Sequence, residues 1–147
     1  MIEISESRSN QLKQFCSMEQ DADAAPNIAP YTHERHLAEY NRSDIVYLSI
    51  YDNHQLAGFF ILALDPDNNS VEFRRIVVAC KDRGTGQQAI SQMETYCREH
   101  LKRNRVWLDV FDFNQRGQHV YAKLGYKFFD QKDFHGKTLL CYQKSIA

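Results

Sequence analysis

The stretch from Ile76 to Ile90 combines residue types that bind phosphate groups. An apolar, β-branched run ends at Lys81-Asp82-Arg83-Gly84-Thr85-Gly86, and a helical pattern follows at once. Glycines let the backbone approach a ligand closely and adopt positive φ angles. Free N–H groups at a helix N-terminus attract anions, and Arg83 adds a guanidinium with forked donors. The sequence therefore predicts a site for the pyrophosphate of a cofactor.

Two common phosphate-binding loops fit this stretch poorly. The P-loop requires Gly-Lys-Ser/Thr, which the chain lacks. The dinucleotide fingerprint G-x-G-x-x-G is met only in part, because Ala89 stands at its last position. That fold also places its loop near its start, whereas this loop follows several strand-like runs. A nucleotide-binding module is therefore the weakest of the functional hypotheses.

A second group of residues follows a further strand-like run, Leu108 to Asn114. Together the two groups resemble motifs A and B of the GNAT N-acetyltransferase superfamily, and the resemblance covers about residues 44–145. Three positions depart from the usual pattern, namely Lys81, Gln88 and Gly117, where Gly117 replaces a small alanine. The matching residues are Gly84, Gly86, Asn114, Tyr121, Gly125 and Tyr126.

The resemblance implies a single α/β (α+β) domain over residues 1–147. Its mixed, mostly antiparallel sheet would have about seven strands and helices on both faces. Strands four and five, here 71–79 and 105–113, would splay apart and hold acetyl-CoA in the wedge, with no metal. The implied contacts are pantetheine pairing with Ile76, Val77 and Val78, pyrophosphate binding by the N–H groups of Arg83, Gly84, Thr85, Gly86, Gln87 and Gln88, and a pantetheine hydrogen bond from Asn114.

The implied reaction is direct attack of a primary amine on the thioester. The resemblance assigns Tyr121 as the acid that protonates the departing thiolate, and the N–H near Val78 as the donor to the thioester oxygen. Glu72 is the candidate base acting through water, since it stands six residues before Val78 and is therefore expected to share a strand face with it. Simpler interpretations are a core-packing Tyr121, a helix N-cap at Asn114 and a Glu72 salt bridge with Arg74. The competing bases are Asp109, Asp112 and His119.

Other reactive residues are less informative. His33 and His36 stand three apart on a predicted helix, but no acidic or cysteine partner has ligand spacing, so a solvated helix face is favoured over a metal site. Cys80 is interpreted as a small apolar filler. Glu19, Asp21 and Asp23 favour a cationic acceptor if they line a binding site, although a solvated loop is the simpler interpretation. The aromatic residues proposed for an apolar wall are Tyr31, Tyr40, Phe129 and Phe134.

Composition narrows the partners. The chain has 147 residues and a net charge of −1 without a basic run, which disfavours nucleic acid. No apolar run approaches the roughly 20 residues of a membrane span, and the segment 1–6 lacks a signal-peptide pattern. Four cysteines without a C-x-x-C motif indicate reduced thiols and a cytoplasmic protein. The resemblance implies a small-molecule or peptide amine as the partner, and it also allows a homodimer. The alternative function is a non-catalytic acyl-CoA-binding or regulatory domain.

Hydrophobic patterns predict the elements that must position these residues. The amphipathic helix after the glycine loop carries an apolar stripe that includes Ala89, Met93 and Cys97. The turn at residues 65–70 and the Gly125 position, typical of a helix C-terminus, delimit the neighbouring elements. The predicted strands are 1–8, 44–51, 55–64, 71–79, 105–113, 126–131 and 137–146, and the predicted helices are 10–20, 33–40, 86–101 and 115–124.

Overall fold

The computed structural model describes residues 1–20, 29–79 and 84–147. These residues form a mixed sheet in the order β1-β2-β3-β4-β5-β7-β6, in which only β4 and β5 are parallel neighbours. This arrangement confirms the predicted sheet. Its strands are β1 (Ile2–Glu6), β2 (Ile45–Asp52), β3 (Gln55–Leu64), β4 (Ser70–Val78), β5 (Arg105–Phe111), β6 (Lys127–Phe134) and β7 (Lys137–Ser145).

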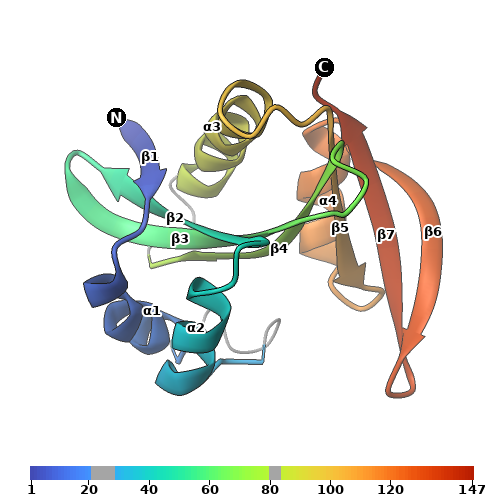
Figure 1. Ribbon diagram of the computed structural model, residues 1–147. Helices are drawn as coiled ribbons and strands as arrows, with labels where there is room; N and C mark the ends of the chain where they lie inside the picture. Colours follow the sequence, from blue (N-terminus) through green and yellow to red (C-terminus); the bar gives the residue numbers. More distant parts are fainter. Residues whose placement is uncertain (21–28, 80–83) are drawn as a thin grey trace.

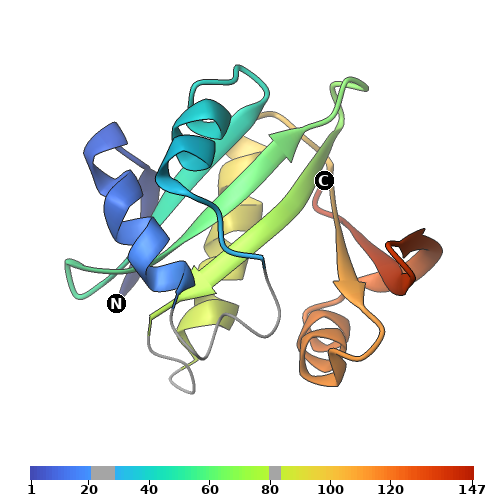
Figure 2. The same cartoon turned by 90° about the horizontal axis from the view of Figure 1, so that it is seen from below.

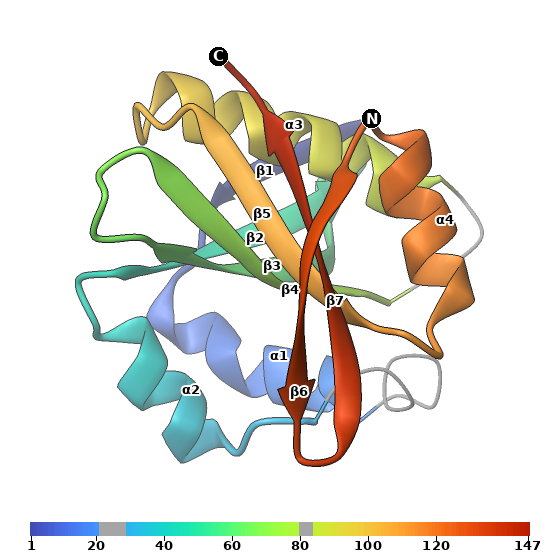
Figure 3. The ribbon, with the colours of Figure 1, turned by 90° about the vertical axis from the view of Figure 1, so that its right-hand side faces the viewer.

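Helices cover both faces of the sheet, as predicted (Figures 1 and 3). One face, the α1/α2 face, carries α1 (Leu12–Glu19), preceded by the short 3₁₀ helix η1 (Ser9–Gln11), and α2 (His33–Tyr40). The other, the α3/α4 face, carries α3 (Thr85–Glu99) and α4 (Gln115–Lys123). No helix among the described residues is both long and apolar enough to cross a membrane.

The alternation of side chains along the strands builds two separate cores. On β3, Phe60 and Leu62 join the cluster under α3, whereas Phe59 and Ile61 join the cluster under α1 and α2. All four side chains are fully buried. The central strands are therefore apolar on both faces, which explains their continuous hydrophobic runs.

β4 and β5 separate soon after they begin. The two strands pair only from Ser70 to Glu72 on β4, where the last pair joins Glu72 and Trp107. β5 then stays paired with β7 along its length, and β4 stays paired with β3. Figure 2 shows the green β4 and the orange β5 running apart toward their C-terminal ends. The predicted splay is confirmed, and from Phe73 onward β4 has no strand partner on its β5 side among the described residues.

A β-bulge in β4 changes which face each side chain occupies. Ile61 of β3 lies opposite Arg75, but the next residue, Leu62, lies opposite Phe73, so that Arg74 is an extra residue. An extra residue reverses the alternation of the strand beyond it. Glu72 therefore lies on the α1/α2 face, like its partner Ala63, whereas Val78 packs against the cluster on the α3/α4 face. The expectation that Glu72 and Val78 share a face was wrong, because the simple period of two does not anticipate the bulge.

Candidate functional site

The unpaired part of β4 offers backbone hydrogen-bonding groups to a ligand. The N–H of Ala79 donates to the carbonyl of Ala57 at 2.7 Å, which makes these residues a hydrogen-bonded pair. Such pairs alternate with pairs whose backbone groups point outward. The N–H and C=O groups of Val78 and Ile76 consequently point to the side that β5 has left, whereas those of Val77 point to β3. Of the three predicted contacts, Ile76 and Val78 have the suitable direction.

The glycine loop lies directly beyond this stretch. Gly84 caps α3 with φ +71°, a conformation that favours glycine. The N–H of Gln88 donates to the carbonyl of Gly84 at 3.2 Å, so the N–H groups of Thr85, Gly86 and Gln87 precede the first intrahelical bond and have no helical acceptor. A hollow of about 360 Å³, lined in part by Ala79 and Thr85, adjoins this end of the helix. The predicted contributions of Lys81, Arg83 and Cys80 lie outside the described residues.

Tyr121 lies beside the point where β4 and β5 separate. Its ring packs edge-on against Phe73, with centroids 5.8 Å apart, and against Tyr126 at 6.1 Å. Burial raises the pKa of Tyr121 to about 12. Its hydroxyl has no hydrogen-bond partner among the described residues, which leaves it available to a ligand. The ring of Tyr121 thus packs in the core, as the simpler interpretation proposed, but its hydroxyl makes no hydrogen bond to the described residues of that core.

Asn114 caps the helix that carries Tyr121. Its Oδ1 accepts a hydrogen bond from the N–H of Gly117 at 2.9 Å. A Cβ atom on Gly117 would lie 2.7 Å from Nδ2 of Asn114, so an alanine there would displace this cap. The unusual glycine at position 117 therefore has a local structural reason. Asn114 acts as the N-cap, and its contact with pantetheine stays a prediction.

Two carboxylates face the α1/α2 side of the same region. Oε1 of Glu72 accepts from Arg74 at 3.1 Å, as the salt-bridge interpretation anticipated. Asp109, two residues beyond the Glu72 partner Trp107, lies on that same face and pairs with Nζ of Lys132 at 3.0 Å. Both carboxylates retain some exposure, 18% for Glu72 and 27% for Asp109. The other competing bases, Asp112 and His119, are exposed to solvent.

The N-terminal acceptor residues occupy other positions than expected. Glu19 and His36 are fully buried and bonded to each other. Glu19 therefore does not offer its charge to an acceptor, and the interpretation of His36 as part of a solvated face was wrong. Asp21 and Asp23 lie outside the described residues. The rings of Tyr31 and Tyr40 pack within the α1/α2 layer, whereas Phe129 and Phe134 are exposed on β6, so these four residues do not form one wall.

The hydrophobic pattern of the sequence did not predict the burial of Glu19 and His36, because Glu and His side chains on helices are usually exposed to solvent. A weak signal existed in the sequence, since Glu19 lies on the same face of its helix as the apolar Leu12 and Phe15. No group of three metal-ligating His, Cys, Asp or Glu side chains occurs in the described part of the chain.

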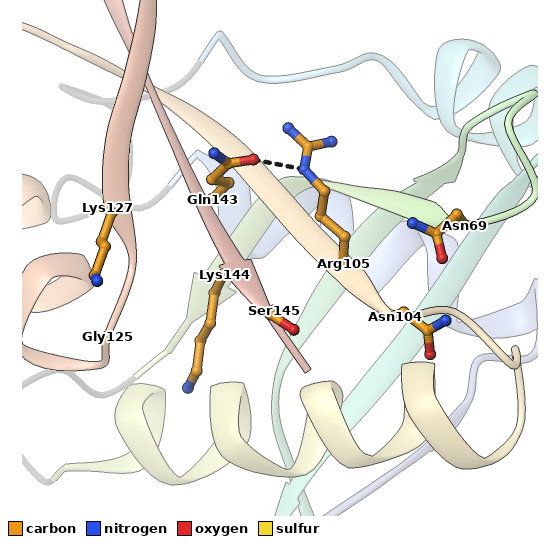
Figure 4. A pocket seen from close by; sticks show the side chains of 8 residues that line it. All are labelled: Asn69, Asn104, Arg105, Gly125, Lys127, Gln143, Lys144 and Ser145. Carbon is orange, nitrogen blue, oxygen red and sulfur yellow. Dashed lines mark hydrogen bonds between the residues drawn. The ribbon is translucent and has the colours of Figure 1, made fainter. Parts of the chain in front are cut away.

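A hollow of about 700 Å³ lies away from this region, where β5 begins and β7 ends (Figure 4). Two of its three cations are already engaged. Arg105 donates to Oε1 of Gln143 at 2.7 Å, and Lys144 pairs with Glu94 at 2.9 Å. Gly84 and the start of α3 lie toward the opposite end of β4, so this hollow is separate from the candidate site.

Comparisons with known proteins agree with this geometry. The model of the acetyltransferase (GNAT) family matches residues 12–126, and a search of curated protein sequences finds no match. A ribosomal-protein-S18-alanine N-acetyltransferase from Escherichia coli has a TM-score of 0.83 at 17% identity, covering 100% of this chain and 95% of that chain. A spermidine N-acetyltransferase from Vibrio cholerae, in complex with CoA and spermine, has a TM-score of 0.84 at 16% identity, covering 98% and 95%. At these identities the structural likeness establishes the fold alone.

Proposed function

Since this chain belongs to the GNAT acetyltransferase family, we propose that it transfers the acetyl group of acetyl-CoA to a primary amine. The observation that carries the proposal is the unpaired stretch of β4 together with the glycine-capped start of α3. A free strand edge recognises an extended chain of amides, and a helix N-terminus recognises phosphate. Pantetheine joined to a pyrophosphate is a ligand that presents both groups in this order.

The residues that would hold acetyl-CoA follow from this geometry. Ile76 and Val78 pair with the pantetheine amides, and the free N–H groups of Thr85, Gly86 and Gln87 bind the pyrophosphate. When bound, acetyl-CoA supplies an activated acyl group as a thioester. The acid and base of the reaction are side chains near the point where β4 and β5 separate.

The amine needs a base because an alkylammonium with a pKa near 10.4 is only about 0.04% neutral at pH 7. Glu72 takes this proton through water from the α1/α2 face. Its partner Arg74, at 3.1 Å, orients the carboxylate. Asp109 is the competing base, since it lies on the same face with Lys132 as its partner.

Tyr121 acts from the opposite face of the sheet. Because its pKa is raised to about 12, its hydroxyl keeps its proton throughout the working pH range. It donates that proton to the sulfur as the carbon–sulfur bond breaks. The new carbon–nitrogen bond forms from the α1/α2 side, where the amine lies. Acid and base are thus separated by the sheet, so that neither neutralises the other.

The acceptor is a small-molecule or peptide amine. The E. coli and V. cholerae proteins named above carry amine acceptors in their names, one a protein alanine and the other spermidine. Both candidate bases of this chain already have cationic partners. A bare polycation would meet Arg74 and Lys132, and we therefore favour an acceptor whose amine lies near a carbonyl or carboxylate.

Thermal melting with and without acetyl-CoA tests the cofactor. Ligand at 100 times its dissociation constant adds about 2.7 kcal/mol to the free energy of unfolding, and ATP and NAD serve as controls. CoA release is then measured with a panel of amines. Stabilisation by acetyl-CoA without turnover of any amine would support the non-catalytic acyl-CoA-binding alternative. Stabilisation by ATP or NAD alone would contradict both.

A further inference from the structure

A buried charged network lies beneath the bulge of β4, on the α1/α2 face. The Arg75 guanidinium donates to Oε2 of Glu19, and its second nitrogen donates to the carbonyl of Ala29 at 2.9 Å. Oε1 of Glu19 also accepts from Nε2 of His36 at 2.5 Å and from the N–H of Tyr31 at 3.2 Å. Glu19 is fully buried, and the Arg75 side chain is 9% exposed. Both oxygens of the carboxylate are therefore satisfied inside the protein.

The proton positions in this network follow from its partners. A carboxylate only accepts hydrogen bonds, so Nε2 of His36 must carry the hydrogen that faces Glu19. Nδ1 of His36 lies 2.7 Å from the hydroxyl of Tyr47. Burial, with the Glu19 carboxylate nearby, raises the pKa of Tyr47, so this hydroxyl keeps its proton. Glu19 thus forms an ion pair with Arg75 and is linked through His36 to Tyr47.

Such a pair needs a reason beyond stability. Removing two charges from water is costly, and apolar residues of similar volume often stabilise a core as well or better. The neighbours of the pair are apolar or aromatic, including Phe59, which packs near the His36 ring. Arg75 is also stacked over the Tyr31 ring at 4.1 Å. The Arg75 side chain is thereby fixed in direction by three partners, namely Glu19, Ala29 and Tyr31.

The position of Arg75 in β4 shows which backbone groups depend on its fixed orientation. Arg75 stands at the bulge, opposite Ile61 and directly after the extra residue Arg74. Ile76 follows at once, and with Val78 it directs its backbone groups toward the side that β5 has left. A change in the angle of the bulge would therefore re-aim these groups, although the Glu19 and Arg75 side chains are buried on the α1/α2 face.

We propose that Arg75 is a positioning residue: held by Glu19 and Ala29, it sets the bulge of β4 in the orientation that presents Ile76 and Val78 to acetyl-CoA. This inference rests on the proposed function. It also explains why α1 and the segment at Ala29, far apart from β4 in sequence, are joined to this one strand position.

The test variant is the double substitution Glu19→Gln with Arg75→Met, which removes both charges and leaves neither buried alone. We expect its dissociation constant for acetyl-CoA to rise about tenfold or more and kcat/KM to fall by up to about 100-fold. KM for the amine should stay within about twofold of wild type, because the acceptor side is not re-aimed. A purely structural role would change all of these constants together or none of them.

The matched control is Glu94→Gln with Lys144→Met. It removes another partly buried ion pair, 2.9 Å long, on the α3/α4 face away from the bulge. Its acetyl-CoA affinity should match wild type. If the Glu19/Arg75 variant folds and also binds acetyl-CoA as wild type does, the proposal is wrong. If that variant does not fold, Arg75→Lys replaces it, since lysine keeps the charge but lacks the fork. Wild-type affinity in Arg75→Lys would equally overturn the proposal.

Amide hydrogen exchange separates this proposal from the proposed function. The N–H of Ala79 bonds to Ala57 beyond the bulge, and the N–H of Leu64 bonds to Asp44 at the other end of β3, both at 2.7 Å. Exchange at Ala79 should accelerate at least about tenfold relative to Leu64 in the double variant. If wild type fails to bind acetyl-CoA, the proposed function fails, and this exchange ratio still decides on Arg75. An unchanged ratio would then refute its role.

Discussion

The ring of Tyr121 packs edge-on against Phe73, which is the first residue of β4 after β5 has separated from it. The centroids lie 5.8 Å apart at an interplanar angle of 79°. This contact anchors α4 at the separation of the two strands and brings a phenol to it. Glu72, the preceding residue, points to the opposite face of the sheet. Two adjacent positions on β4 thus define the two sides of the candidate active site.

Tyr121→Phe should lower kcat by roughly 100-fold while leaving the affinity for acetyl-CoA nearly unchanged. The phenylalanine keeps the edge-on contact with Phe73, and the missing hydroxyl has no partner within the described residues, so stability should change by less than about 1 kcal/mol. Steady-state kinetics and thermal melting check these outcomes. Tyr142→Phe, which removes a hydroxyl from β7, is the control. Full turnover of Tyr121→Phe between pH 6 and 9 would exclude Tyr121 as the acid.

Glu72→Gln should reduce kcat/KM by roughly 100-fold at pH 7. The deficit should shrink toward pH 9, because the neutral fraction of an amine with a pKa near 10.4 rises about tenfold per pH unit and the base becomes less necessary. Asp109→Asn removes a carboxylate from the same face and is the matched comparison. The kinetics of both variants between pH 6 and 9 decide the assignment. A larger, pH-dependent loss in Asp109→Asn would transfer the role to that residue.

Gly117→Ala should lower the free energy of unfolding by about 1 kcal/mol, because the new Cβ displaces the Asn114 cap, and Asn114→Ala should cost a similar amount. In the Asn114→Ala background the clash is absent. Gly117→Ala should then be neutral or stabilise by up to about 1 kcal/mol, since alanine favours a helix more than glycine does. Urea unfolding of the four proteins forms a double-mutant cycle. Additive effects would show that the contact between the two residues has no energetic role.

Stability should decline in alkaline solution, in part through Cys97. Burial, with Glu94 nearby, raises the pKa of this thiol to about 12, whereas an unfolded thiol ionises near 8.5. The contribution of Cys97 is fully present below pH 8.5 and is lost as the pH rises toward 12. Between pH 9 and 10, the stability of wild type should fall more steeply than that of Cys97→Ala, by about 1 kcal/mol per pH unit.

Wild type and Cys97→Ala are compared by the slope of stability against pH. Their absolute stabilities also differ because Cys97→Ala leaves a cavity. Ile90→Val, a core variant without a titrating group, should be less stable than wild type but have the same slope. Equal slopes in wild type and Cys97→Ala would contradict a buried, neutral thiol at this position.

Most elements of the fold could be predicted from the sequence. The helix at 33–40 and the strand at 55–64 have the predicted bounds, because apolar periodicity and turn residues act over a few neighbouring positions. The boundary errors are also local. β5 ends at Phe111 because the chain turns there, with the N–H of Asn114 bonded to the carbonyl of Phe111. The candidate site residues came from two short motifs, and the structure brings Gly84, Val78 and Tyr121 to the region where β4 and β5 separate.

By itself, the sequence determined the strands and helices, their order and the family, since spacing and residue type are properties of neighbouring positions. Only the tertiary structure decided the faces of β4 and the environment of its partners. A single extra residue, Arg74, moved Glu72 and Val78 to opposite sides. Glu19, His36 and Arg75 became a buried network because three distant segments meet there. Burial and charge pairing depend on which surfaces come together in space, and no local pattern encodes that meeting.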